Sequence, residues 1–457
     1  MNKNQSMVGR KDGYVSQALS IMISRILILA LILLMSAGEN GVAQKRSDVE
    51  GQIVIGPTVE LITIAVEDFR MPGGFPIPDD SSLAVNMHQV LIDDLQFSLY
   101  FNVVQPDSAF LVDFARGNMK LDDWIYLGAR MLLAGRMERE GAGILFTAEI
   151  IDTYRNKIIY SRDFVGEPSA YRYLMHRVAY DILHNIVGEE GPFFSKIVFS
   201  STATGNSEIY FCDFDGYGLN QATHDKSINV IPNWSVDGKQ IYFTSYKRGN
   251  PDLYIYDLAA GKNHSFSSRA GLNTSAVPSP DGNYVVGTLS LGGDAEIYLF
   301  DPSGRIVKRL TFSRMIDTSP TWSPTSREIA FTSDRTGQPQ IYITNVDGLN
   351  TRRLTFYGDY NDQASWSPRG DILAYASRER DGFQIYTIVI TGQSPRRLTD
   401  VGSNESPSWS PDGLHIVYTS NVSGEHKLMV MDYNGANKRG LGIPGACKTP
   451  DWSRNIR

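Results

Sequence analysis

The strongest constraint on the fold of this chain is a short motif that recurs at a nearly constant spacing. The clearest copy is Trp409-Ser410-Pro411-Asp412-Gly413. Related copies begin at Trp234, Pro278, Trp322 and Trp366, and a stub lies at Trp452-Ser453. Successive copies are 44, 44, 44, 43 and 43 residues apart. Periods of about 40–45 residues are typical of the four-stranded blades of β-propellers, so the repeat predicts a propeller.

The composition of each copy fits a blade. Proline presets the backbone of a tight turn, aspartate bonds its own backbone and glycine accepts a positive φ. An apolar strand such as Ile416–Ser420 follows the motif, and a second strand such as Gln340–Ile343 leads to the turn Val346-Asp347-Gly348. We expect the tryptophan to act as a wedge between neighbouring blades, because it carries a large apolar area.

The two ends of the repeat predict how the ring closes. The first unit begins with the strand Lys196–Ser201, which has no Trp-Ser turn before it, whereas Trp452-Ser453 has no strand after it. Each end supplies what the other lacks, so the last strand is expected to complete the first blade and remove the exposed edges. This count gives a six-bladed β-propeller over residues 196–457.

Residues 59–188 lack the repeat and predict a small two-layer α/β domain, joined to the propeller by a linker at 189–195. The predicted strands are Leu61–Val66, Phe101–Val104, Met131–Gly135, Leu145–Asp152 and Lys157–Phe164. One predicted helix is capped by Ser81 or Ser82 and buries Val85, Val90, Leu91 and Leu95; a short one lies at Asp122–Gly128; another runs from Ser169 to Gly188. The chain is therefore expected to be mainly β, with an α/β domain in front.

The N-terminal residues 1–43 have the pattern of a signal peptide. Arg25 precedes an apolar run from Ile26 to Met35, and small residues lead to Gly41-Val42-Ala43. The run is too short for a transmembrane helix, and the start is at Met1 or Met22. Residues 44–58 then form a tail that either docks as an edge strand or stays flexible. We expect a secreted or periplasmic protein that is not inserted in the membrane; the alternative is that the segment stays uncleaved as an anchor.

Composition and motif spacing exclude several classes of function. The net charge of −7 argues against nucleic acid as a partner. Cys212 and Cys447 are too few for a disulfide scaffold, and they either pair or are two small buried side chains. No Gly-x-Ser-x-Gly elbow occurs, and the seven histidines show no metal-binding spacing, so we expect no enzyme, no metal and no cofactor. His176 and His184 are expected on a helix surface.

Polar segments before the inner strands are the candidate binding site. In the order of the repeats they are Asn273, Thr274 and Ser275; Asp317, Thr318 and Ser319; Asn361, Asp362 and Gln363; and Asn404, Glu405 and Ser406. All of them should converge on one mouth of the propeller channel. They either cap their strands or bind a partner, since recognition residues tend to lie on loops held by a rigid scaffold.

The combination of these parts resembles the TolB family of the Tol–Pal system. The motifs that carry the resemblance are Phe331-Thr332-Ser333-Asp334-Arg335, Gly337–Tyr342, Asp213-Phe214-Asp215-Gly216-Tyr217 and Ala364-Ser365-Trp366-Ser367. The α/β domain in front of the propeller and the Trp-Ser stub make the match specific, and it covers nearly all of the chain after residue 43.

The resemblance implies a non-enzymatic periplasmic adaptor. It implies that the channel mouth binds the lipoprotein Pal, that the tail binds TolA, and that other outer-membrane proteins are further candidate partners. The tail residues concerned would be Val49, Gln52, Ile53, Val54 and Ile55. The system supports outer-membrane invagination during division and envelope integrity. Leu272, Ser275 and Thr318 correspond to residues that face Pal, although a histidine stands at the position of Leu272 in the family.

Two other functions stay open on the sequence alone. One is an exported hydrolase with a site that spans both domains. The other is a propeller that binds a small ligand or a glycan, which predicts more exposed aromatic side chains around the channel mouth than these Asn, Asp and Thr loops offer.

Overall fold

The computed structural model describes residues 60–71, 78–106, 110 and 119–456. The predicted signal peptide and tail lie outside these residues, as does most of the predicted loop at 71–78.

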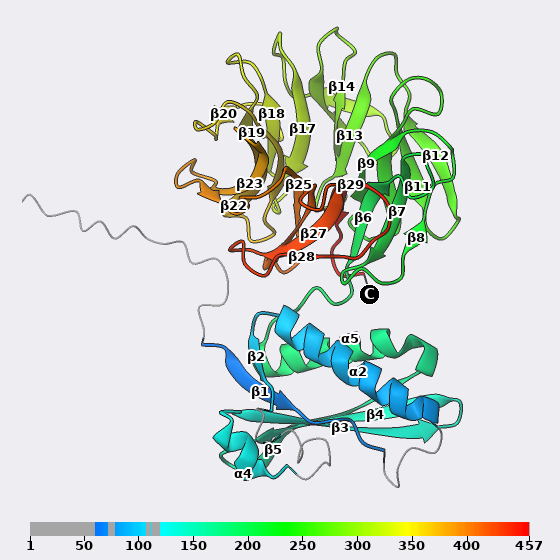
Figure 1. Ribbon diagram of the computed structural model, residues 1–457. Helices are drawn as coiled ribbons and strands as arrows, with labels where there is room; N and C mark the ends of the chain where they lie inside the picture. Colours follow the sequence, from blue (N-terminus) through cyan, green and yellow to red (C-terminus); the bar gives the residue numbers. More distant parts are fainter. Residues whose placement is uncertain (1–59, 72–77, 107–109, 111–118, 457) are drawn as a thin grey trace, which may run out of the picture. The chain divides into compact units, whose positions relative to one another are not determined.

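The α/β domain is a five-stranded mixed sheet with two long helices on one face (Figure 1). The strand order is β2-β1-β3-β4-β5; β1 is parallel to β2 and β3, and the other pairs are antiparallel. The elements are β1 (Ile62–Val66), α2 (Pro78–Phe97), β2 (Phe101–Val104), α4 (Leu121–Tyr126), β3 (Met131–Glu140), β4 (Gly143–Asp152), β5 (Lys157–Gly166), a 3₁₀ turn (Pro168–Ala170) and α5 (Tyr171–Val187).

Alternation along the strands explains both layers of this domain. On β4, Ile144, Phe146, Ala148 and Ile150 are fully buried in the core shared with α2 and α5. On the opposite side of the sheet, the short helix α4 packs Trp124 against Ala65 and Leu132. The sheet therefore buries both of its faces around β1, which lies between β2 and β3.

Three details of this domain differ from the sequence predictions. Helix α2 begins at Pro78 rather than after Ser81 or Ser82, because proline fits the first turn of a helix, where its missing N–H is not needed. Val85 is 65% exposed and does not face the core. Strand β3 continues to Glu140 because its polar end pairs with Gly143 of β4.

Six four-stranded antiparallel sheets form the propeller. The inner strands are β9 (Asn229–Trp234), β13 (Asn273–Pro278), β17 (Asp317–Trp322), β21 (Asn361–Trp366), β25 (Asn404–Trp409) and β29 (Cys447–Trp452). The second strands are β10 (Gln240–Ser245), β14 (Val285–Leu289), β18 (Glu328–Ser333), β22 (Ile372–Glu379), β26 (His415–Ser420) and β6 (Lys196–Ser201).

The two remaining strands of each blade lie further from the channel. The third strands are β11 (Asp252–Asp257), β15 (Glu296–Phe300), β19 (Gln340–Asn345), β23 (Gly382–Val389), β27 (Lys427–Asp432) and β7 (Glu208–Asp213). The outer strands are β12 (Lys262–Ser267), β16 (Ile306–Arg309), β20 (Arg352–Arg353), β24 (Arg396–Arg397), β28 (Arg439–Gly440) and β8 (Asn220–Gln221).

The last strand completes the first blade, as the repeat predicted. Strand β29 pairs with β6, which places Trp452 opposite Ile197. The indole Nε1 of Trp452 donates to Ser195 Oγ at 2.8 Å. The prediction of a six-bladed propeller preceded by an α/β domain is confirmed.

The motif tryptophans pack between blades. Trp322 is buried against Val286, Ile297 and Leu299 of the preceding blade, and its indole Nε1 donates to Val277 O at 2.9 Å. The turns that follow Trp234, Trp322, Trp366 and Trp409 are closed by the serine after each tryptophan, as where Gly413 N donates to Ser410 O at 2.9 Å. The repeat motif is therefore scaffold.

Within the described ranges, no helix has both the length and the apolar character needed to cross a membrane.

Candidate binding site at the mouth of the propeller channel

Each inner strand begins at the mouth of the channel and bends within its first residues. The pairing register of the inner strand with its neighbour shifts after the second residue, as between Thr318 and Thr321. The third residue then takes a left-handed conformation, with φ between 50° and 56° in all six blades: Ile231, Ser275, Ser319, Gln363, Ser406 and Thr449. Such a backbone is uncommon outside glycine, and its sixfold recurrence shows that the bulge belongs to the blade design.

The bulges line a central cavity of about 180 Å³. Its wall consists of the third to fifth residues of the inner strands, including Ser275, Gln363 and Ser406. Gln363 Oε1 accepts bonds from Ser406 N at 2.8 Å and Ser406 Oγ at 3.1 Å, which ties two neighbouring blades together. The channel wall therefore mixes polar side chains, some of them bonded across blades, with the prolines Pro232, Pro320, Pro407 and Pro450.

Asp451 is the carboxylate on this wall. Its two oxygens accept from Trp234 N at 2.8 Å and Ser408 Oγ at 3.2 Å. Burial raises the pKa of Asp451 to about 6, and these hydrogen bonds offset only part of the rise.

In the blades of β13, β21 and β25, the asparagine that begins the inner strand is a structural cap, not an exposed contact. Asn361 is fully buried and donates to Gln340 Oε1 at 2.9 Å and Tyr357 O at 2.7 Å. Asn404 repeats this arrangement, donating to Gln384 Oε1 at 3.0 Å. Asn273 is also fully buried and donates to backbone carbonyls of the loop before it, including Arg269 O at 2.6 Å.

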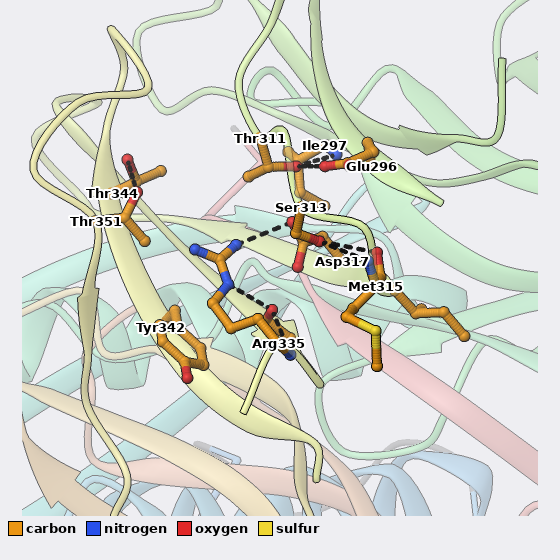
Figure 2. A network of polar contacts seen from close by, with 12 residues as sticks. Glu296, Ile297, Thr311, Ser313, Met315, Asp317, Arg335, Tyr342, Thr344 and Thr351 are labelled. Atoms are coloured by element: carbon orange, nitrogen blue, oxygen red, sulfur yellow. Dashed lines mark hydrogen bonds and ion pairs between the residues drawn. The ribbon is translucent and has the colours of Figure 1, made fainter. Parts of the chain in front are cut away.

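The blade of β17 builds the same cap from charged groups (Figure 2). Asp317 and Glu296 stand at the positions of the asparagine and glutamine that form the caps of β21 and β25. No amide donor therefore links Asp317 to Glu296. Arg335 instead donates to Asp317 Oδ2 at 2.9 Å, and Arg309 donates to Glu296 Oε1 at 2.7 Å. Burial raises the pKa of Glu296 and the neighbouring Asp317 adds to the rise, while Thr311 and Arg309 act against it. In the loop before β17, Ser313 Oγ donates to Met315 O at 2.9 Å and accepts from Met315 N at 3.2 Å (Figure 2).

The second residues divide into engaged and half-open positions. Thr274 is buried and shares a hydrogen bond with Thr244 at 3.0 Å. Asp362 accepts from Thr332 at 2.7 Å, and Glu405 accepts from Ser403 at 3.2 Å. Thr318, Asp362, Glu405 and Leu272 are half-buried, so part of each side chain is accessible. Ser275 is buried but lines the channel.

An apolar rim beside the mouth was missed by the sequence reasoning. We call it the rim: Phe312, Met315, Ile316, Phe356, Tyr357 and Val401, exposed by 74%, 41%, 54%, 62%, 69% and 62%. These residues lie on the loops before β17, β21 and β25. Arg309 and Arg353 place their guanidinium groups 4.8 Å and 5.0 Å from the ring centres of Phe312 and Phe356. The repeat register could have found this rim, because Phe312 and Phe356 are 44 residues apart.

The other side chains that could have carried chemistry, a histidine and two cysteines, are buried in the structure. His176 is 5% exposed, so the prediction of a surface histidine is wrong; its Nδ1 lies 2.7 Å from Asp94 Oδ2, between α5 and α2. Cys212 and Cys447 are both buried and free. Among the residues that the structure describes, no cluster of three His, Cys, Asp or Glu side chains could hold a metal ion. The tail residues Val49, Gln52, Ile53, Val54 and Ile55 lie outside the described residues.

Taken together, the fold and this site define a class: two-domain proteins with an α/β domain in front of a closed six-bladed propeller. Residues 183–456 match the family model of the TolB beta propeller domain, and residues 52–159 match that of the TolB amino-terminal domain. The chain belongs to the TolB family, a component of the Tol–Pal system.

Individual relatives agree with this assignment over part of their length. The Tol-Pal system protein TolB of Desulfosudis oleivorans is 36% identical over 191 residues, which cover 41% of this chain and 43% of that protein. The TolB of Geobacter sulfurreducens is 38% identical over 180 residues, which cover 39% and 41%. The chain thus matches less than half the length of these relatives. The crystal structure of TolB from Acinetobacter baumannii superposes with a TM-score of 0.74 at 25% identity, covering 87% of this chain and 97% of that one.

Proposed function

We propose that this chain is a periplasmic adaptor of the Tol–Pal system that binds the lipoprotein Pal at the propeller mouth and TolA through its N-terminal tail. In this role it supports outer-membrane invagination during division and the integrity of the outer membrane. Membership of the TolB family supports the system, and the mouth supports the kind of partner.

The observation that carries the proposal is the composition of the mouth. Half-open polar side chains such as Thr318 and Asp362 lie beside the rim, whose aromatic residues are accompanied by arginines. Exposed aromatic residues and arginine, next to polar groups that can be desolvated, are typical of surfaces that bind folded proteins. Because the caps hold the backbone rigid, the loops lose little conformational entropy when a partner binds.

The rim also bears on the glycan alternative, which requires open aromatic faces. Arg309 and Arg353 lie over the rings of Phe312 and Phe356, so one face of each ring is already occupied. This arrangement favours a protein partner over a sugar. The hydrolase alternative gains nothing from Asp94 and His176, because both side chains are buried between helices.

Isothermal titration of the mature protein with purified Pal tests the proposal. We expect measurable heat and a defined affinity for the wild type, and a loss of affinity for Thr318→Arg, which places a large cation in the mouth. Leu349→Arg is the matched control, because Leu349 is 63% exposed on a turn at the other end of its blade. Absence of heat with the wild type, or equal affinities for the two arginine variants, would argue against Pal binding at this mouth.

A further inference from the structure

The α/β domain carries a long sheet edge that the proposed function does not use. Strand β5 spans ten residues, and among the described residues no strand pairs with its outer side. The other sheet edge, β2, has four residues, and the outer strands of the blades have between two and six. Proteins commonly shorten or cover their edges to prevent pairing with other chains, so an edge of this length stands out.

The backbone of β5 offers free hydrogen-bonding groups in its middle. Arg177 on α5 donates to Val165 O at 3.1 Å from outside the β4–β5 pair. Because the N–H and C=O of one residue point to the same side, and the side alternates along a strand, the backbone groups of Ser161 and Asp163 also point outward. Ile158, Ile159 and Val165 are 49%, 40% and 55% exposed, so the strand presents apolar side chains beside these groups.

A groove runs along this edge on the side of the helices. It has a volume of about 310 Å³. It is lined by Arg162, Asp163 and Phe164 of β5, by Tyr173, Arg177, Tyr180 and Asp181 of α5, and by the linker residue Phe194. Tyr173 is 57% exposed. A strand added to β5 would direct every second side chain into this groove, which is how peptides are bound where a sheet edge lies beside a helix.

The charges of the groove select the ligand. Arg162 is paired with Asp181, and Asp163 accepts a hydrogen bond from Thr147. Arg177 lies 6.0 Å from the Phe164 ring centre and has no carboxylate partner among the described residues. We propose that β5 and this groove bind an extended segment of a partner protein as an added strand, with a large apolar side chain in the groove and an acidic side chain on Arg177.

A labelled peptide tests this inference on the mature full-length protein. The probe is the acetylated peptide Thr-Val-Thr-Phe-Thr-Asp-Thr-Val-Thr, and binding is followed by fluorescence anisotropy. We expect saturable binding with a dissociation constant below about 100 µM. Ser161→Pro should weaken it at least about tenfold, because it removes an outward N–H that only an added strand would use. Arg177→Glu should weaken it similarly and should favour the peptide with lysine in place of aspartate.

Two controls separate binding from folding. Ser161→Pro should leave the melting temperature nearly unchanged, whereas Arg162→Pro should lower it, because the N–H of Arg162 faces β4. No saturable binding to the wild type, or equal binding to wild type and to Ser161→Pro, would overturn the proposal. A concentration-dependent dimer that Ser161→Pro dissolves would also overturn it, since the occupant would then be a second copy of this chain. None of these results depends on Pal, so failure here leaves the proposed mouth untouched.

Discussion

At the scale of single residues, a buried ion pair makes the stability of this protein depend on pH. Burial by itself would lower the pKa of His176, but the carboxylates of Asp94 and Asp215 together outweigh it, and the pKa rises to about 9. The imidazole is therefore charged in the folded protein at neutral pH, where a free histidine, with a pKa of about 6.5, would be mostly neutral.

A pH dependence of stability follows from this pair. The folded state holds the proton more tightly than the unfolded state, so the stabilisation is complete below about pH 6.5 and is lost as the pH rises through about 9. We expect the free energy of unfolding to fall by up to about 3 kcal/mol across this range. Urea denaturation at pH 6 to 9.5 checks this, and Asp94→Asn should flatten the curve. An unchanged slope in Asp94→Asn would show that another group is responsible.

The motif tryptophans are expected to dominate stability within the propeller. Trp409 is 4% exposed, packs against Ile372, Ala374 and Ile385 of the preceding blade, and donates to Ser365 O at 3.2 Å. Trp409→Ala should cost about 3–5 kcal/mol, measured by urea denaturation. Leu349→Ala, at a side chain that is 63% exposed, should change the free energy by less than about 0.5 kcal/mol. Similar effects of the two variants would contradict the role of Trp409 as a wedge.

Site residues were harder to predict than core residues for a physical reason. Asn361 and Thr318 are both small polar residues at the start of an inner strand, yet one is a buried cap and the other is half-open. Capping and recognition call for the same residue types, so the sequence pattern does not separate them. Only the register shift after the second residue, which is a tertiary feature, turns the third residue into the channel.

At the scale of elements, the closing strand β29 is the decisive one. It covers the side of β6 that faces the channel and pairs Cys447 with Ser201 at one end and Trp452 with Ile197 at the other. Its place was predictable because the ends of the repeat complement one another. The boundaries of α2 and β3 were not, because Pro78 and the polar end of β3 carry no apolar periodicity.

Removal of this strand should therefore open the ring. Deletion of residues 447–457 leaves an edge of β6 unpaired and exposes the interior of the first blade. We expect loss of the cooperative thermal transition and association of the protein, followed by differential scanning fluorimetry and light scattering. Deletion of the C-terminal Arg457 alone is the control and should behave as the wild type. A monomeric deletion variant with an unchanged melting temperature would show that the ring does not depend on β29.

At the scale of the whole molecule, the repeat and the domain order sufficed to predict the architecture, because a constant period reflects one structural unit copied many times. The surfaces that bind partners could not be predicted in the same way. The rim depends on exposure, which the sequence shows only indirectly, and the tail lies outside the described residues.

The tail leads to a prediction about TolA. Deletion of residues 44–58 from the mature protein should abolish binding of TolA while leaving the melting temperature nearly unchanged, because a segment that is read as a flexible peptide adds little to the fold. Surface plasmon resonance with immobilised TolA and a thermal melt check the two halves of the statement. A drop of many degrees in the melting temperature would mean that the tail is a structural strand.

Hydrogen exchange of the protein with and without Pal is the sharpest test of Pal binding at the propeller mouth, because it maps the contact without any mutation. We expect slower exchange in the loops before β17, β21 and β25 and at the first residues of the inner strands, with the Pro-Asp-Gly turns at the other end unchanged. Protection confined to those turns or to the α/β domain would contradict it.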